Sequence, residues 1–199
     1  MKVVASLFAA VVAACGVLEA DAMAHFKLLS PPPALIEDSA GGPDQKSSPC
    51  GTGQNSNVVT PLQAGQTVTL KWQETVVHPG HFRIALALKG RNELKDPVAK
   101  IDPLKNNCDS ATIESPVLPI LADGVNVHTE AQSEVGKMWE ATVTIPANVT
   151  CDKCTLQVVQ FMAEHAFNNP GGYSYHHCAE LQITADPKKP IDKGWPAER

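Results

Sequence analysis

The stretch His81–Leu88 reads HFRIALAL and is the clearest indication of the fold class. Phe82, Ile84, Leu86 and Leu88 stand at every second position. Successive side chains of an extended strand point to opposite faces, so these four share one face. The stretch therefore predicts a β-strand that packs one face against a hydrophobic core.

The same alternation recurs along the chain, and turn-forming residues separate the alternating stretches. The chain has 16 Pro, 13 Gly and no long stretch of helical periodicity. We therefore predict an all-β fold, an antiparallel β-sandwich with long loops. We expect Ser30–Gly53 to form a Pro- and Gly-rich loop and Arg91–Ala122 to form a mostly irregular insertion. The other expected strands are Gln66–Trp72, Met138–Ile145, Thr155–Met162 and Cys178–Thr184.

Length and charge limit the possible classes of protein. The chain has 199 residues and a net charge of −5. This mild acidity gives no basic stripe of the kind that nucleic-acid binding requires. Its length suits one domain with its own core. Trp72 and Trp139 fall inside strand patterns, so we expect them in that core, whereas Trp195 lies in a charged tail, residues 185–199.

The first 24 residues have the pattern of a signal peptide. Lys2 precedes the apolar stretch Val3–Cys15, which is too short to span a bilayer as a helix. Ala22-Met23-Ala24 then provides small residues for a signal peptidase, so cleavage would leave His25 as the first residue. An alternative is a bacterial lipobox ending at Cys15, which would leave His25 internal. No later segment is apolar for long enough to span a membrane.

Five of the six cysteines follow this cleavage site. In an exported chain such cysteines predict structural disulfides, and the odd number leaves one thiol over. The pair Cys151 and Cys154 has the spacing of half a zinc site, but no second pair of this kind follows. The sequence does not fix the connectivity of the five, which are Cys50, Cys108, Cys151, Cys154 and Cys178.

An N-terminal histidine offers an unusual pair of metal ligands. The α-amine of His25 has an ordinary pKa of about 7.7–8.0, so its neutral form is present near neutral pH. Its ring nitrogen can close a chelate with that amine, and one further imidazole completes a set of three nitrogens. Such a set suits copper. We expect His78, in the turn sequence His78–Phe82 before a strand, to be the second histidine, and His81 is the competitor.

A third motif surrounds Tyr175, three residues before Cys178. Tyr175 is either a core aromatic residue or a group beside the metal. We expect His176 and His177 to lie on the surface, and we assign no role to His128.

Together these features resemble the lytic polysaccharide monooxygenases, nearest to their chitin-binding type-4 branch. The shared features are the signal peptide, His25, the His78-x-Gly80 turn, the Cys151-x-x-Cys154 stretch and Tyr175 before Cys178. The resemblance implies an immunoglobulin-like or fibronectin-like sandwich over residues 25–184. It also implies one copper ion in a histidine brace.

Residue roles follow from the resemblance. His25 would bind copper through its amine and ring, and His78 through its ring. Tyr175 would occupy the axial position, and His165 with Glu164 would hydrogen-bond the bound oxidant. Cys178 would pair with Cys50.

The resemblance also implies a function. The protein would be a secreted or periplasmic monomer that uses an external electron donor to cleave chitin, cellulose or a related polysaccharide oxidatively. One alternative is a copper-binding or copper-delivery protein with the same brace and no oxygenase activity. A second is a structural or adhesion sandwich without metal.

Overall fold

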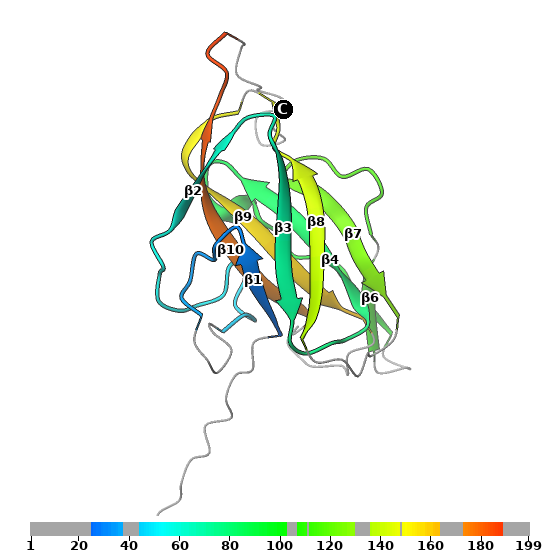
Figure 1. Cartoon of the computed structure of the whole chain (residues 1–199). Coiled ribbons are helices and arrows are strands. Elements are labelled where there is room, and N and C mark those ends of the chain that lie inside the picture. Colours follow the sequence, from blue (N-terminus) through cyan, green and yellow to red (C-terminus); the bar gives the residue numbers. More distant parts are fainter. Residues whose placement is uncertain are drawn as a thin grey trace, which may run out of the picture.

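The fold is a sandwich of β-strands, shown from the side in Figure 1. The computed structural model describes residues 25–37, 44–102, 107–110, 112–129, 136–147, 149–163 and 173–188, with only the backbone of 101–102 and 107–110. The strands are β1 (Phe26–Ser30), β2 (Val59–Gln63), β3 (Thr67–Glu74), β4 (Gly80–Ala87), β5 (Ala99–Asp102), β6 (Asn107–Ser110), β7 (Ile120–His128), β8 (Lys137–Thr144), β9 (Cys151–Met162) and β10 (Ser174–Thr184), with a short 3₁₀-helix η1 at Arg91–Glu93.

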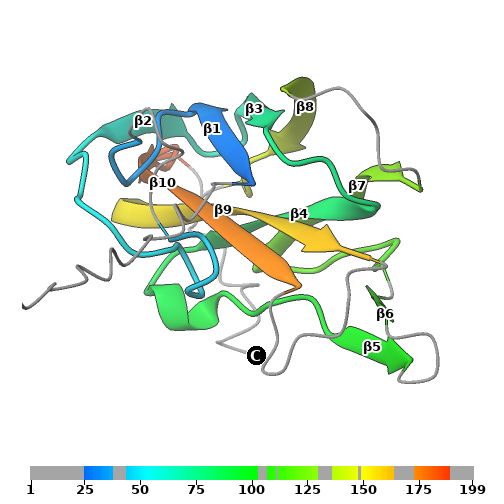
Figure 2. The same ribbon diagram turned by 90° about the horizontal axis from the view of Figure 1, so that it is seen from below.

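Two sheets face each other across the core. One has the order β1-β3-β8 and the other β2-β10-β9-β4-β7. All pairs are antiparallel except β2 with β10, which is parallel. The strands β5 and β6 form a separate hairpin, which lies on the outer side of the larger sheet in Figure 2. The expected immunoglobulin-like β-sandwich with long loops is confirmed.

The core lies where the inner faces of the two sheets meet. Trp72 of β3, Phe26 of β1 and Phe82 of β4 are fully buried there, with the Phe82 ring centre 4.9 Å from that of Trp72. The alternating residues Ile84 and Leu86 continue this face, as the sequence predicts. Trp139 packs partly buried against the same cluster. Burial of these apolar side chains is the main source of stability.

The outer face of the larger sheet is also covered. Every residue of β4 is buried, although a strand at the surface of a sandwich buries only alternate residues. Polar contacts hold the covering segments in place. Gln157 of β9 donates to the carbonyl of Pro49, and Arg91 of η1 pairs with Glu180 of β10. The described parts of the Ser30–Gly53 loop and of the Arg91–Ala122 insertion therefore form an outer layer over this sheet.

Several sequence expectations need correction. The expected strands are confirmed, but β9 and β10 begin earlier than predicted, and β1, β2 and β7 were missed. The insertion predicted as mostly irregular contains η1 and the β5–β6 hairpin, and β7 begins within it. The disulfide Cys50–Cys178 is confirmed, and Cys151 pairs with Cys154. The side chain of Cys108 lies outside the described residues.

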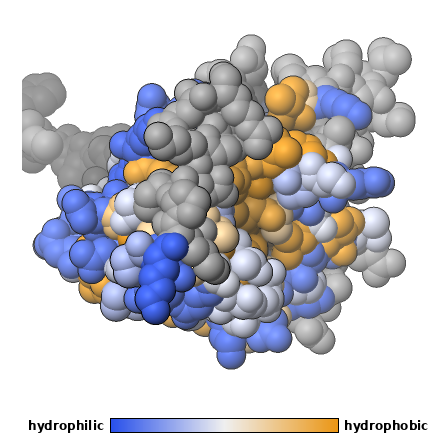
Figure 3. Space-filling view, turned by 90° about the horizontal axis from the view of Figure 1, so that it is seen from above, coloured by the Kyte–Doolittle hydropathy of each residue, from blue (hydrophilic) through white to orange (hydrophobic). Residues whose placement is uncertain are grey.

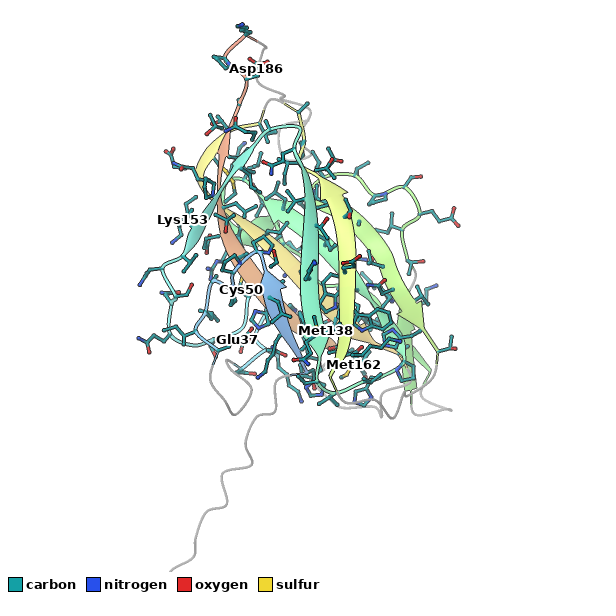
Figure 4. All side chains as sticks on the ribbon, in the orientation of Figure 1. Glu37, Cys50, Met138, Lys153, Met162 and Asp186 are labelled. Atoms are coloured by element: carbon teal, nitrogen blue, oxygen red, sulfur yellow. A yellow bond between two sulfur atoms is a disulfide. The ribbon has the colours of Figure 1, made fainter. Side chains whose placement is uncertain are left out.

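The two ends of the sandwich differ. Figure 3 shows hydrophobic side chains gathered on part of the upper end, where β4 ends and β7 begins. Leu88, just after β4, and Leu118 and Leu121, around the start of β7, pack partly buried against the core. At the lower end β1 begins and β3 ends, and Figure 4 places Met138 and Met162 near it. Over the described residues, no helix is both long and apolar enough to cross a membrane.

Candidate metal centre

His25 lies at the lower end of the sandwich, immediately before β1. Its carbonyl oxygen accepts hydrogen bonds from the backbone N–H groups of Thr75 and Val76, at 2.9 and 3.2 Å. These bonds extend the pairing of β1 with β3, in which Phe26 lies opposite Glu74. The start of β1 is therefore fixed against the loop that follows β3.

His78 lies in that loop, between β3 and β4. Its ring centre is 5.9 Å from that of His25, and the two ring planes differ by 17°. Two imidazoles far apart in the sequence thus lie side by side at one end of the fold.

Gly80 explains the spacing between His78 and the start of β4. Its φ angle is 154°, and a Cβ atom there would lie 1.9 Å from the carbonyl oxygen of Phe161 on the neighbouring strand β9. Only glycine fits such a close approach. The turn that carries His78 therefore depends on the absence of a side chain two residues later.

Replacing Gly80 by alanine is expected to destabilise the fold by at least about 3 kcal/mol, because β4 or β9 has to move. The matched control is Gly65→Ala. Gly65 also has a positive φ of 79°, but nothing lies within 4 Å of its added Cβ. The control is expected to cost about 1 kcal/mol. Urea unfolding measures both values, and equal losses would contradict the close approach at Gly80.

The ring of Tyr175 stacks on the ring of His25. Its ring centre is 3.6 Å from that of His25, with a plane angle of 23°. Tyr175 is buried, and the Nζ atom of Lys46 lies 5.7 Å from its ring centre. Burial, with a smaller contribution from the charge of Asp44, raises the pKa of Tyr175 to about 12. The phenol is therefore neutral across the physiological pH range.

This shift predicts a loss of stability at high pH. The unfolded phenol has a pKa near 10 and the folded one a pKa of about 12, so the folded state holds the proton more tightly. The contribution of the neutral Tyr175 phenol to the free energy of unfolding is complete below pH 10. It is lost as pH rises to 12, by up to roughly 2 kcal/mol. Urea unfolding from pH 9 to 11.5 should show this decline in wild type and a smaller one in Tyr175→Phe. If the free energy of unfolding falls equally with pH in wild type and in Tyr175→Phe, the raised pKa of Tyr175 is wrong.

The buried carboxylate of Glu74, at the end of β3, accepts hydrogen bonds from several segments near His78. Glu74 is 0% exposed and accepts hydrogen bonds from Trp139 Nε1 at 2.7 Å and Gln160 Nε2 at 2.6 Å. The backbone N–H of His78 donates to it at 3.4 Å. Three strands and the His78 loop thus meet at one carboxylate.

His128, given no role from the sequence, also faces Glu74. Its Nε2 lies 3.5 Å from Glu74 Oε1, and its Nδ1 lies 2.7 Å from the carbonyl oxygen of Asn126. Burial works against the charged ring, but the bonds to Glu74 and Asn126 outweigh it, so the pKa of His128 is raised.

The remaining histidines of the described segments lie elsewhere. The competitor His81 is buried on the outer face of β4, where Nε2 is 3.7 Å from Asp123 Oδ1 and the ring stacks on Phe161. The expectation that His176 and His177 are surface residues is wrong, since each is 1% exposed. The outer layer covers His176, and His177 faces inward against Phe26. His165 and Glu164 lie outside the described residues.

Sequence reasoning missed Gln45, Glu74 and Gln160, all of which contact the segments that carry His25 and His78. Each is a polar residue without a motif of its own. Their positions depend on contacts between distant segments, and the only local signal was the isolated Glu74 at the end of an alternating strand.

The residues present fit a copper ion bound by nitrogens. In the described part of the chain, no group of three or more His, Cys, Asp or Glu side chains is arranged to hold a metal. A metal at the two imidazoles would gain a third nitrogen ligand from the main chain of His25 once that nitrogen is a free amine. The centres of the two rings are 5.9 Å apart, close enough for one ion to contact both rings.

Comparisons with known proteins give the family. The family model described as "Lytic polysaccharide mono-oxygenase, cellulose-degrading" matches residues 19–181. Among the curated proteins compared, none matches the chain.

Among the solved structures that resemble the chain are two lytic polysaccharide monooxygenases. The lytic polysaccharide monooxygenase AA15 from Thermobia domestica in the Cu(I) state is 19% identical, with a TM-score of 0.39 and 66% of each chain covered. The AA10 enzyme from Streptomyces lividans is 16% identical, with a TM-score of 0.39, covering 86% of this chain and 89% of that one. Membership rests on the family model, which spans most of the sequence: the chain belongs to the lytic polysaccharide monooxygenases, whose members use copper.

Proposed function

We propose that the protein is a copper-dependent polysaccharide monooxygenase with one copper ion bound by His25 and His78. The ligands would be the freed amine of His25, its ring and the ring of His78. The observation that carries this proposal is the pairing of the two imidazoles, 5.9 Å apart, at the start of β1. The nitrogen-rich set suits copper above the other divalent metals.

The chain's own residues would orient and shield the ion. Tyr175 packs against the His25 ring and would lie beside the ion as a neutral phenol. Glu74 would hold the His78 loop through the backbone N–H. Copper, when bound, supplies the redox chemistry that activates O₂ or H₂O₂. The roles of His165 and Glu164 as hydrogen-bonding groups for the oxidant stay predictions.

The proposal requires cleavage before His25, because only a free amine has a lone pair for the metal. Residues 1–24 would thus be a signal peptide, and the protein would be secreted or periplasmic. Residues 25–184 would form the copper-binding domain and residues 185–199 a tail. Members of the family are generally extracellular, which supports this assignment.

The proposed substrate is a β-linked polysaccharide, with cellulose first because the family description names it. An external reductant would supply electrons. The test incubates the copper-loaded protein with cellulose and, separately, with chitin, each with ascorbate, and detects oxidised oligosaccharides by mass spectrometry. Products from cellulose are expected. Products from chitin alone would correct the substrate.

One observation keeps the copper-binding or copper-delivery function as a second candidate. Among the described residues, the large hydrophobic side chains that are exposed include no aromatic one that could stack on a sugar. A protein that binds one copper ion tightly, yet releases no oxidised sugar from either polysaccharide, would fit this second function.

A further inference from the structure

Gln45 holds the main chain at the start of β1. Its side chain is buried, and its Oε1 accepts hydrogen bonds from the backbone N–H groups of His25 at 2.8 Å and Phe26 at 3.4 Å. Its Nε2 donates to the carbonyl oxygen of Phe26. One amide side chain therefore binds both polar groups of Phe26 and the nitrogen of His25.

The backbone of Gln45 is itself fixed to the larger sheet. Its carbonyl oxygen accepts from the backbone N–H of His176 and lies 2.8 Å from the ring Nδ1 of the same residue. The other ring nitrogen, Nε2, lies 2.8 Å from Asp96 Oδ1. Gln45 is thus anchored by β10 and, through His176, by the insertion.

The loop that carries Gln45 is also tied covalently to the same strand. Cys50, five residues further on, forms its disulfide with Cys178 of β10. Non-covalent and covalent contacts therefore fix both ends of this short segment. A side chain on so restrained a segment has little freedom to move away from His25.

Resting on the copper site proposed above, we propose that Gln45 is a positioning residue that orients the His25 nitrogen toward the metal. After cleavage, the amine keeps an N–H directed at Gln45 Oε1. With that hydrogen fixed, rotation about the N–Cα bond is restricted, and the lone pair is held toward the two imidazoles. The contact already exists for the peptide nitrogen in the intact chain, so cleavage frees a nitrogen that is in place.

The test compares three variants of the chain that begins at His25. Gln45→Met keeps the length of the side chain and removes its hydrogen bonds. Gln45→Glu keeps an acceptor for the His25 nitrogen and replaces the donor to Phe26 with a carboxylate oxygen. The matched control is Gln66→Met, since Gln66 is an exposed residue of the β2–β3 turn that accepts a backbone hydrogen bond from Gln63.

The readouts are Cu(II) affinity by competition with a chelator, the EPR spectrum of the fully loaded protein, and thermal unfolding without metal. Gln45→Met is expected to bind Cu(II) about tenfold more weakly, equivalent to about 1.4 kcal/mol, with altered nitrogen hyperfine couplings. Gln45→Glu should keep a spectrum like wild type, and Gln66→Met should match wild type throughout.

Other outcomes separate this inference from the proposed function. A wild-type chain that binds no copper would refute the proposed function itself. If wild type binds copper but Gln45→Met has the same affinity and spectrum, the positioning role is wrong. If Gln45→Met and Gln45→Glu are altered equally, in affinity and spectrum or by failing to fold, Gln45 serves only the fold and the inference is also wrong.

Discussion

A chain that begins at His25 with its amine acetylated is expected to lose tight copper binding. Acetylation converts the amine to an amide, which has no basic lone pair and closes no chelate with the imidazole. Two imidazoles from His25 and His78 then remain. The dissociation constant for Cu(II) should rise at least about a thousandfold, equivalent to about 4 kcal/mol.

The measurement is isothermal titration of Cu(II) into the acetylated chain and, as control, into the same chain with a free His25 amine. The acetylated chain keeps the N–H that contacts Gln45, so its fold and thermal unfolding without metal should be unchanged. Tight binding by the acetylated chain would exclude the amine as a ligand.

His78→Ala is expected to have an effect of similar size, because it removes one of three nitrogen ligands. The affinity for Cu(II) should fall by about three orders of magnitude. The matched control is His81→Ala, three residues along the same turn and strand. His81 faces Asp123 and Phe161 on the outer face of β4, so its removal should leave copper affinity unchanged. The reverse result would make His81 the ligand.

The strands that could be predicted are those whose alternation is uninterrupted. β4 follows this rule from His81 onward, and the edge strand β2 does not, because Pro61 interrupts it. In β7, Gly124 and Asn126 have positive φ angles, which break the two-residue period. Such segments become strands because they pair with neighbouring strands of the sheet. A single sequence does not show which segments pair.

The site was predictable in part for a related reason. His25 and His78 stand in local motifs, a cleavage site and a Pro-Gly turn, so their residue types carry a signal. Gln45 has no such signal, because its role depends on a loop meeting β1 from another part of the chain. The mistaken surface assignment of His176 has the same origin, since Gln45 and Asp96 from two separate loops cover it.

The most direct test of the copper site is a titration of Cu(II) into the chain that begins at His25, followed by EPR. The account predicts tight binding of one ion, with hyperfine coupling to three nitrogens that falls to two in His78→Ala. No tight binding, or a spectrum from wild type that does not change when His78 is removed, would contradict it.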